Sequence, residues 1–297
     1  MRYASRIIAG KNAWIWAGVN AGLVYGQTFG GYDVAEVIVL ANQKGGVGKT
    51  TTAVNLAACL AVMEKKILLV DCDPQGNATS GVGWDKQTNR DDLYSVYFSA
   101  QNFHQAVHAT NFPYLSILPG TSDLVGAELE LVKKKNREFY LRDGIKSLKD
   151  DFDFIIIDCP PSLGLLTVNA LCAARHLVVP MQCEFYALEG IAQLMRTYSL
   201  VRQRLNTELE LLGVVLTMHD PRSNLTKDVE SEVCTHFPGM VFSTTIPRNI
   251  RLSEAPSHGL PVINYDIKSK GSQAYLKFAE ECFGRVEEKV RKGTPRN

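Results

Sequence analysis

One stretch of the chain limits its possible folds more than any other: a glycine-rich loop between an apolar run and an amphipathic one. The loop has the sequence NQKGGVGKTT from Asn42 to Thr51, after the apolar run Val37–Ala41 and before a helical pattern that continues to Met63. Glycines let successive backbone N–H groups turn inward, and the start of a helix adds its positive end and unpaired N–H groups. This order of strand, loop and helix predicts a cradle for the phosphates of a nucleotide.

The residues of this loop have separate expected roles. Lys49 would supply positive charge to the β- and γ-phosphates, and the Thr50 hydroxyl is placed to bind Mg²⁺. Gln43 occupies the position of the first glycine in the usual pattern G-x-x-x-x-G-K-[ST], so the loop is a variant of it. The residues predicted to contact the nucleotide here are Gly45, Gly46, Val47, Gly48, Lys49, Thr50 and Thr51.

Two other apolar runs end in carboxylates. Ile67–Val70 is followed by Asp71 and Asp73, which alternation along a strand would place on one face. Phe154–Ile157 ends in Asp158, the form expected of a strand whose aspartate holds the Mg²⁺ shell, often through water. Because parallel α/β sheets bind ligands at their carboxyl edge, we expect the three acids to lie beside the phosphate loop.

Beyond residue 37, short β-branched apolar runs alternate with longer amphipathic stretches. Several runs are apolar throughout, which is typical of strands buried on both faces of a parallel sheet. This alternation predicts an α/β fold with one mostly parallel twisted sheet and helices on both faces. The expected strands are Val37–Ala41, Ile67–Val70, Leu115–Leu118, Phe154–Asp158, Leu177–Pro180, Leu212–Thr217 and Val241–Ile246. The expected helices span 49–63, 122–134, 138–149, 163–174, 187–206, 225–236 and 272–291.

A single domain is expected at residues 34–291, with an N-terminal extension at 1–33 and a short tail at 292–297. No repeat, low-complexity segment or proline-rich linker divides the central part. The 7 cysteines include no C-x-x-C pair and mostly lie in apolar runs, which favours reduced core thiols over disulfides or a metal site. The formal net charge of +1 means that binding to nucleic acid or membrane would need a local patch.

The extension loosely imitates a secretory signal, because basic residues precede the apolar stretch Ala13–Tyr25. That stretch is short and is interrupted by Gly18, Asn20 and Gly22, so it is poorly suited to span a bilayer. We therefore favour a poorly ordered extension over export or membrane tethering.

The phosphate loop, with its second lysine at Lys44, resembles the deviant Walker A family, which includes the ParA/Soj partition ATPases, MinD and the nitrogenase iron protein. Two further segments, DCDPQGNAT at 71–79 and IIDCPPSLGLLTVNAL at 156–171, resemble the ParA/Soj branch specifically. The resemblance covers nearly everything from 37 to 283.

This resemblance implies roles for the charged residues. Lys44 would reach across a dimer interface to the partner's nucleotide, and a cation supplied in this way stabilises transition-state charge and ties hydrolysis to assembly. With Lys44 and Lys49, the third catalytic residue would be Asp73, which would position the attacking water. Asp158 would be the Walker B acid, and Asp71 would support the Mg²⁺ site together with Thr50.

The resemblance also implies partners. Arginines at the positions of Arg222 and Arg251 bind DNA without reading its sequence in the Soj-like branch, and guanidinium groups suit phosphate. Pro247, Arg248 and Asn249 are expected near the adenine. ATP with Mg²⁺ would join two subunits into a homodimer that binds double-stranded DNA, until hydrolysis stimulated by a ParB-type centromere-binding protein releases it. Such a protein would partition a chromosome or a plasmid in the cytoplasm, in association with the nucleoid.

Two other classes of protein stay open. A MinD-like ATPase that cycles on membranes would end in a basic amphipathic helix lying on lipid. The stretch 272–291 carries an apolar stripe, for which we favour packing in the core, so no stable membrane association is expected. A redox or metabolic enzyme on the same scaffold, such as a small-molecule ligase, is the second alternative. Cys159 is the nearest candidate for a shared cluster, and the 6 histidines show no ligand spacing, so no metal besides Mg²⁺ is expected.

Overall fold

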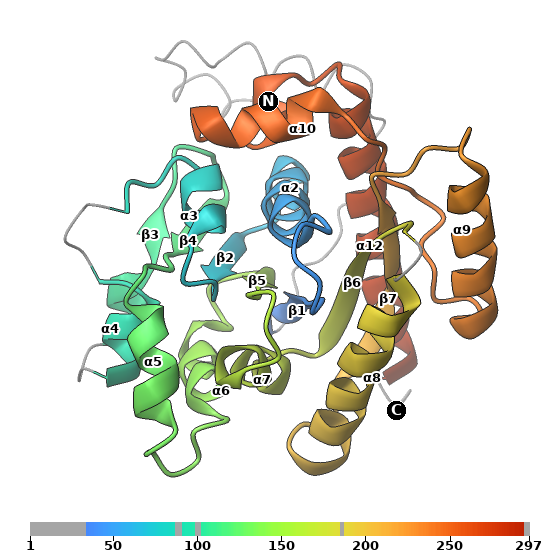
Figure 1. Cartoon of the computed structure of the whole chain (residues 1–297). Coiled ribbons are helices and arrows are strands. Elements are labelled where there is room, and N and C mark those ends of the chain that lie inside the picture. The colour runs from blue at the N-terminus through green and yellow to red at the C-terminus, as the bar shows by residue number, and fades with distance from the viewer. Residues whose placement is uncertain (1–33, 87–90, 99–101, 185–186, 294–297) are drawn as a thin grey trace. The chain divides into compact units, whose positions relative to one another are not determined.

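The computed structural model describes residues 34–86, 91–98, 102–184 and 187–293. Within these residues one sheet of seven strands has the order β3-β4-β2-β5-β1-β6-β7 (Figure 1). Only β3 is antiparallel to its neighbour β4, which confirms the predicted mostly parallel sheet. The strands are β1 Glu36–Leu40, β2 Ile67–Asp71, β3 His108–Ala109, β4 Leu115–Leu118, β5 Phe154–Asp158, β6 His176–Gln182 and β7 Glu210–Thr217.

Each predicted helix is present near its expected position, except that 138–149 is the helix Tyr140–Ile145 followed by a 3₁₀ turn at Lys146–Leu148. The sequence patterns did not predict the short helices Asn77–Gly81, Leu93–Phe98, Ile250–Glu254 and Val262–Tyr265. The longer helices are α2 Lys49–Val62, α5 Leu124–Leu131, α7 Leu165–Ala173, α8 Ala187–Arg204, α9 Asn224–His236 and α12 Lys270–Gly293. The shorter ones are α3 Asn77–Gly81, α4 Leu93–Phe98, α6 Tyr140–Ile145, α10 Ile250–Glu254 and α11 Val262–Tyr265, with 3₁₀ turns also at Phe103–Ala106 and Ala255–His258. In the described part of the chain, no helix is both long enough and apolar enough to cross a bilayer.

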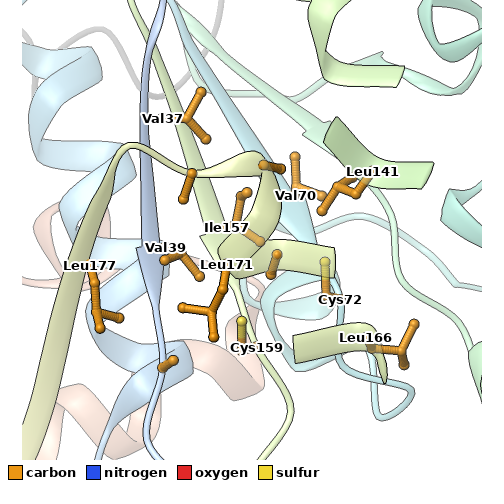
Figure 2. Close-up of a cluster of buried hydrophobic side chains, with 14 of the residues drawn as sticks. Val37, Val39, Val70, Cys72, Leu141, Ile157, Cys159, Leu166, Leu171 and Leu177 are labelled. Carbon is orange, nitrogen blue, oxygen red and sulfur yellow. The ribbon is translucent and has the colours of Figure 1, made fainter. Parts of the chain in front are cut away.

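Alternate residues of each central strand point to opposite sides of the sheet, and both sides are buried against helices. On one face Val39, Val70 and Ile157 pack together with Leu171 of α7 (Figure 2). On the other face Ile38 belongs to a second core that includes α2 and α12. This double burial explains why the central strands are apolar throughout rather than alternating with polar residues.

The predicted strand Val241–Ile246 is wrong. Val241 forms only an isolated bridge with Val214, and the N–H groups of Ser243 and Thr244 donate to the carboxylate of Glu281 at 2.9 Å each instead of to a neighbouring strand. Phe242 is nevertheless buried. The segment lies along β7, with backbone hydrogen bonds such as Phe242 N–H to the Val214 carbonyl and Ile246 N–H to the Leu216 carbonyl, but it does not form a regular strand. The seventh strand is the two-residue β3, which no sequence pattern indicates.

The sheet brings the three expected acidic positions to one edge. β1 lies between β5 and β6, and its register pairs Leu40 with Asp158. The register of β2 with β5 pairs Asp71 with Asp158. The glycine-rich loop follows β1 directly, so it leaves the sheet at the same carboxyl edge as these acids, as parallel topology requires. The predicted extension at 1–33 and residues 294–297 of the tail lie outside the described residues.

Candidate functional site

The glycine-rich loop ends in a left-handed residue that starts α2. Gly48 has a φ of +83° and Gly46 a φ of +75°, a region that residues with a Cβ rarely adopt. The first N–H groups of α2 have no acceptor within the helix and are directed toward the loop. On the other side, the Thr217 hydroxyl at the end of β7 donates to the Val47 carbonyl at 2.8 Å. The loop is therefore fixed from two elements and offers backbone N–H groups to an anion.

Lys49 lies inside this loop rather than on the surface. Its side chain is buried, and Nζ donates to the carbonyl oxygen of Lys44 at 3.0 Å. Burial lowers the pKa of Lys49, while the nearby groups Asp158, Cys159 and Asp73 favour the charged form. An ammonium group held by one carbonyl keeps two further donors, which suits it to phosphate oxygens.

Asp158 is the one carboxylate of the site that the protein leaves open. It is fully buried, and among the described residues neither of its oxygens has a hydrogen-bond partner. Burial, followed by the charge of Asp71, raises its pKa well above the usual range, and Thr50 lies close enough to favour the ionised form. A buried and unsatisfied carboxylate next to a threonine hydroxyl is the donor set that suits Mg²⁺, which takes few protein ligands and keeps several waters.

Asp71, by contrast, is already occupied. Its Oδ2 accepts from the backbone N–H of Thr79 at 2.8 Å and the hydroxyl of Thr79 at 2.7 Å, and its Oδ1 accepts from the N–H of Asp73 at 3.1 Å. Burial raises the pKa of Asp71 to about 6 in spite of these hydrogen bonds. The carboxylate thus ties the start of α3 and the residues after β2 to the sheet, next to Asp158.

Asp73 lies beyond the end of β2, so strand alternation does not place it. The strand ends at Asp71, and the backbone then turns at Gly76, which has a φ of +60°. Asp73 is nonetheless buried, and its Oδ1 accepts from the N–H of Gln75 at 2.9 Å. A turn, and not a continued strand, brings this carboxylate to the site.

Lys44 lies at the rim of the site and is bound by a residue that sequence reasoning missed. Its ammonium group forms an ion pair with Glu184, which follows β6, and about a third of the Lys44 side chain is exposed. The Asn42 side chain accepts from the Lys44 N–H at 3.1 Å and donates to the Pro180 carbonyl at 2.8 Å. The contact joins residues 140 positions apart, so no local spacing could reveal it.

The residues expected near the adenine lie beside the end of β7. Pro247 forms an isolated bridge with His219, and the His219 ring contacts Glu230 at 3.0 Å. Asn249 caps α10, because its side chain accepts from the N–H of Arg251 at 3.0 Å. The position of Pro247, Arg248 and Asn249 near the adenine stays a prediction.

The two arginines expected to bind DNA are paired with acids of their own chain. Arg222 contacts both oxygens of Asp220 at 3.1 and 3.2 Å, and its side chain is 89% exposed. Arg251 contacts Glu254 at 2.7 Å and Asp266 at 3.3 Å. These pairs raise the pKa of both guanidinium groups, which stay charged.

A glycine-rich loop between β1 and α2, a buried lysine within it and an open aspartate at the end of β5 together define a P-loop nucleotide-binding protein. A family model described as an AAA domain matches residues 35–211. The chromosome partitioning protein ParA of Myxococcus xanthus is 51% identical over 264 residues, which cover 89% of this chain and 93% of that protein. The sporulation initiation inhibitor protein Soj of Bacillus subtilis is 51% identical over 248 residues, or 84% and 98% of the two chains. The chain belongs to the ParA/Soj family of chromosome-partitioning ATPases.

Solved structures with bound nucleotide are also similar to this chain. Cobyrinic acid a,c-diamide synthase from Mycobacterium smegmatis, with bound ATP analog and magnesium, matches with a TM-score of 0.76 at 37% identity. The match covers 86% of this chain and 96% of that chain.

Proposed function

We propose that this protein is a DNA-partitioning ATPase that dimerises on ATP. The observation that carries the proposal is the position of Lys44 in a chain of the ParA/Soj family. Its ammonium group lies at the exposed rim, paired with Glu184, whereas Lys49 occupies the phosphate loop itself. A site whose second lysine faces outward is suited to completion by another subunit.

ATP is proposed as the nucleotide, contacted by the loop from Gly45 to Thr51 and, around the base, by Pro247, Arg248 and Asn249. Mg²⁺ bound with it would neutralise charge on the phosphates, held by Thr50 and Asp158, partly through water. Within the described residues no cluster of three or more His, Cys, Asp or Glu side chains is arranged for a metal. This agrees with a Mg²⁺ site, because Mg²⁺ is usually held by one or two protein ligands together with phosphate oxygens of the substrate.

Hydrolysis is proposed to need groups from both subunits. Asp73 orients the attacking water, Lys49 stabilises charge within its own site, and Lys44 does so in the partner's site. Because the complete set exists only in the dimer, turnover of the isolated protein should be slow. A ParB-type partner would raise it.

The DNA interface is proposed to include Arg222 and Arg251 of both subunits. Dimerisation would double a weak patch, and two linked sites gain effective concentration on one DNA molecule. Binding of this kind is independent of sequence and falls with salt. The ATPase domain at 34–291 would act in the cytoplasm, on DNA of the nucleoid.

The MinD-like alternative is disfavoured by α12. Its apolar stripe packs inside the second core, where Tyr275, Phe278, Cys282 and Val286 are all buried. A stripe that is used for packing is not available to lie on lipid. Small-molecule ligase chemistry is disfavoured because the sequence is more similar to the partition proteins, at 51% identity, than to the synthase, at 37%.

One preparation tests the proposal by sedimentation and DNA retention with ATP, with ADP and without nucleotide. We expect dimers and retained DNA only with ATP. Lys44→Ala should abolish both, while ADP affinity stays, because Lys44 completes the site of the other subunit. A wild-type protein that stays monomeric when saturated with a non-cleavable ATP analogue would refute the proposal.

A further inference from the structure

The ion pair between Lys44 and Glu184 fixes the lysine within its own subunit. Glu184 follows β6, which runs beside β1 (Figure 1), and its backbone N–H donates to the Gln182 carbonyl at 2.9 Å. The Lys44 backbone is held at the same place through Asn42 and Pro180. The acid and the lysine are therefore positioned by separate contacts, and their meeting does not depend on the ion pair alone.

The ion pair with Glu184 holds Lys44 within its own subunit and therefore competes with any contact between Lys44 and the nucleotide of a second subunit. An ammonium group has three donors, but the phosphate that Lys44 would contact lies across the dimer interface. We therefore take each Lys44 to move away from its own Glu184 when the dimer forms, which breaks two such pairs. This consequence rests on the proposed function, because it needs Lys44 to act across the interface.

We propose that Glu184 is a positioning residue for Lys44, which holds the ammonium group in the monomer and thereby raises the protein concentration at which ATP-bound dimers form. It acts only through Lys44 and takes no part in the chemistry. Both side chains are partly exposed, at 36% and 42%, so the pair is a weak restraint and not a block. Exposed pairs of this kind change an equilibrium by about 1.4- to 5-fold, and two pairs change the dimer dissociation constant by about 2- to 30-fold.

Glu184→Gln tests this directly, with sedimentation over a range of protein concentrations in a non-cleavable ATP analogue. We expect the dimer dissociation constant to fall by about 2- to 30-fold. ADP affinity and the melting temperature of the monomer should change little, because Glu184 meets the phosphate loop only through the partly exposed side chain of Lys44. Glu184→Asp keeps the charge on a shorter side chain and should give an intermediate constant. The difference between wild type and Glu184→Gln should shrink at high salt, since exposed ion pairs are screened.

A matched control is Glu210→Gln. Glu210 forms a comparable pair with Lys289, at exposures of 45% and 29%, on β7 and α12. This variant should leave the dimer constant unchanged. If Glu184→Gln gives the wild-type constant, or a weaker dimer, the positioning role is refuted, while a wild type that never dimerises with the analogue refutes the proposed function instead.

Discussion

At the scale of single residues, the site holds two neighbouring carboxylates where water does not reach. Asp71 satisfies its oxygens with Thr79 and Asp73, but Asp158 satisfies neither of its own. An unsatisfied buried charge lowers stability by about 1–3 kcal/mol or more. The site therefore gives up stability in the nucleotide-free protein for a group that is open to a cation.

Asp158→Asn should stabilise the nucleotide-free protein by about 1–3 kcal/mol at a pH where the wild-type carboxylate is ionised. Because the folded pKa is raised, wild-type Asp158 binds its proton more tightly when folded, and this advantage is lost as pH rises above about 4. The gain from the substitution should therefore grow with pH from that point. Urea unfolding at several pH values measures it. The same variant should lose the extra stability that Mg²⁺ with nucleotide gives wild type.

A flat difference between Asp158→Asn and wild type across this pH range would contradict the electrostatic account. So would a variant that Mg²⁺ and nucleotide stabilise as strongly as wild type.

Asp73→Ala should give dimers that bind DNA with ATP and do not release it, because the carboxylate proposed to orient the attacking water is gone while the phosphate loop is intact. Phosphate release and DNA retention, measured on one sample, check this. Asp73→Asn is the matched control, since its side-chain oxygen can still accept from the Gln75 N–H. Both variants should fail to turn over, and normal turnover in Asp73→Ala would refute the role.

Much of the site could be predicted at this scale, because the phosphate loop and the strand-end acids are local patterns. The residues next to Lys49 and Asp158 in the sequence are enough to predict their roles, because each belongs to a short local motif. Glu184 and Thr217 could not be found in this way. Each meets the loop through tertiary contacts, and neither residue type is unusual after a strand.

At the scale of elements, the segment after β2 depends on a close approach between two loops. Gly76 has a φ of +60°, and a Cβ there would lie 2.5 Å from the Gly120 carbonyl oxygen. That backbone belongs to the loop after β4 and has no room to move aside, because a Cβ on Gly120 would itself lie 2.5 Å from the Asp71 carbonyl. The position of Asp73 therefore requires glycine at both positions 76 and 120, where the two loops come close together.

Gly76→Ala should destabilise the protein by more than about 2 kcal/mol, since left-handed strain adds to a backbone clash. Gly239→Ala is the matched control, because its φ is +72° and nothing lies within 4 Å of the added Cβ. That variant should lose only about 1–2 kcal/mol. Urea unfolding measures the loss of stability in both variants. Equal losses would show that the two loops do not approach each other closely enough at Gly76 to exclude a Cβ.

Sequence patterns predict the central strands and long helices well, because double burial makes the strands apolar and packing gives the helices their stripe. They fail at Val241–Ile246, which pairs with β7 only irregularly because Glu281 takes the N–H groups of Ser243 and Thr244. They also miss the short helices α3, α4, α10 and α11. Helices of four to six residues carry no periodicity, and the position of α10 depends on its cap, Asn249.

At the scale of the whole molecule, the family and the fold that the sequence predicts are confirmed. Whether the proposed surface attracts DNA depends on its balance of positive and negative charge. A net charge of +1 gives no long-range attraction to a polyanion. Arg222 is paired with one acid and Arg251 with two, so under the proposed function each would exchange carboxylates for phosphates on binding DNA. Arg222 has less to give up, because it has a single partner and is almost fully exposed.

Arg222→Ala should therefore flatten the salt dependence of DNA binding by the ATP-bound dimer. Each phosphate contact contributes about 0.9 to the slope of log affinity against log salt, and two subunits lose one contact each, so the slope should fall by about 1.8. DNA titrations at several salt concentrations measure this. Arg291→Ala is the control, because Arg291 is also exposed and paired, with Glu287 on α12, but lies outside the proposed interface. An equal fall in both variants would mean that any surface arginine serves, and that Arg222 has no special place in the interface.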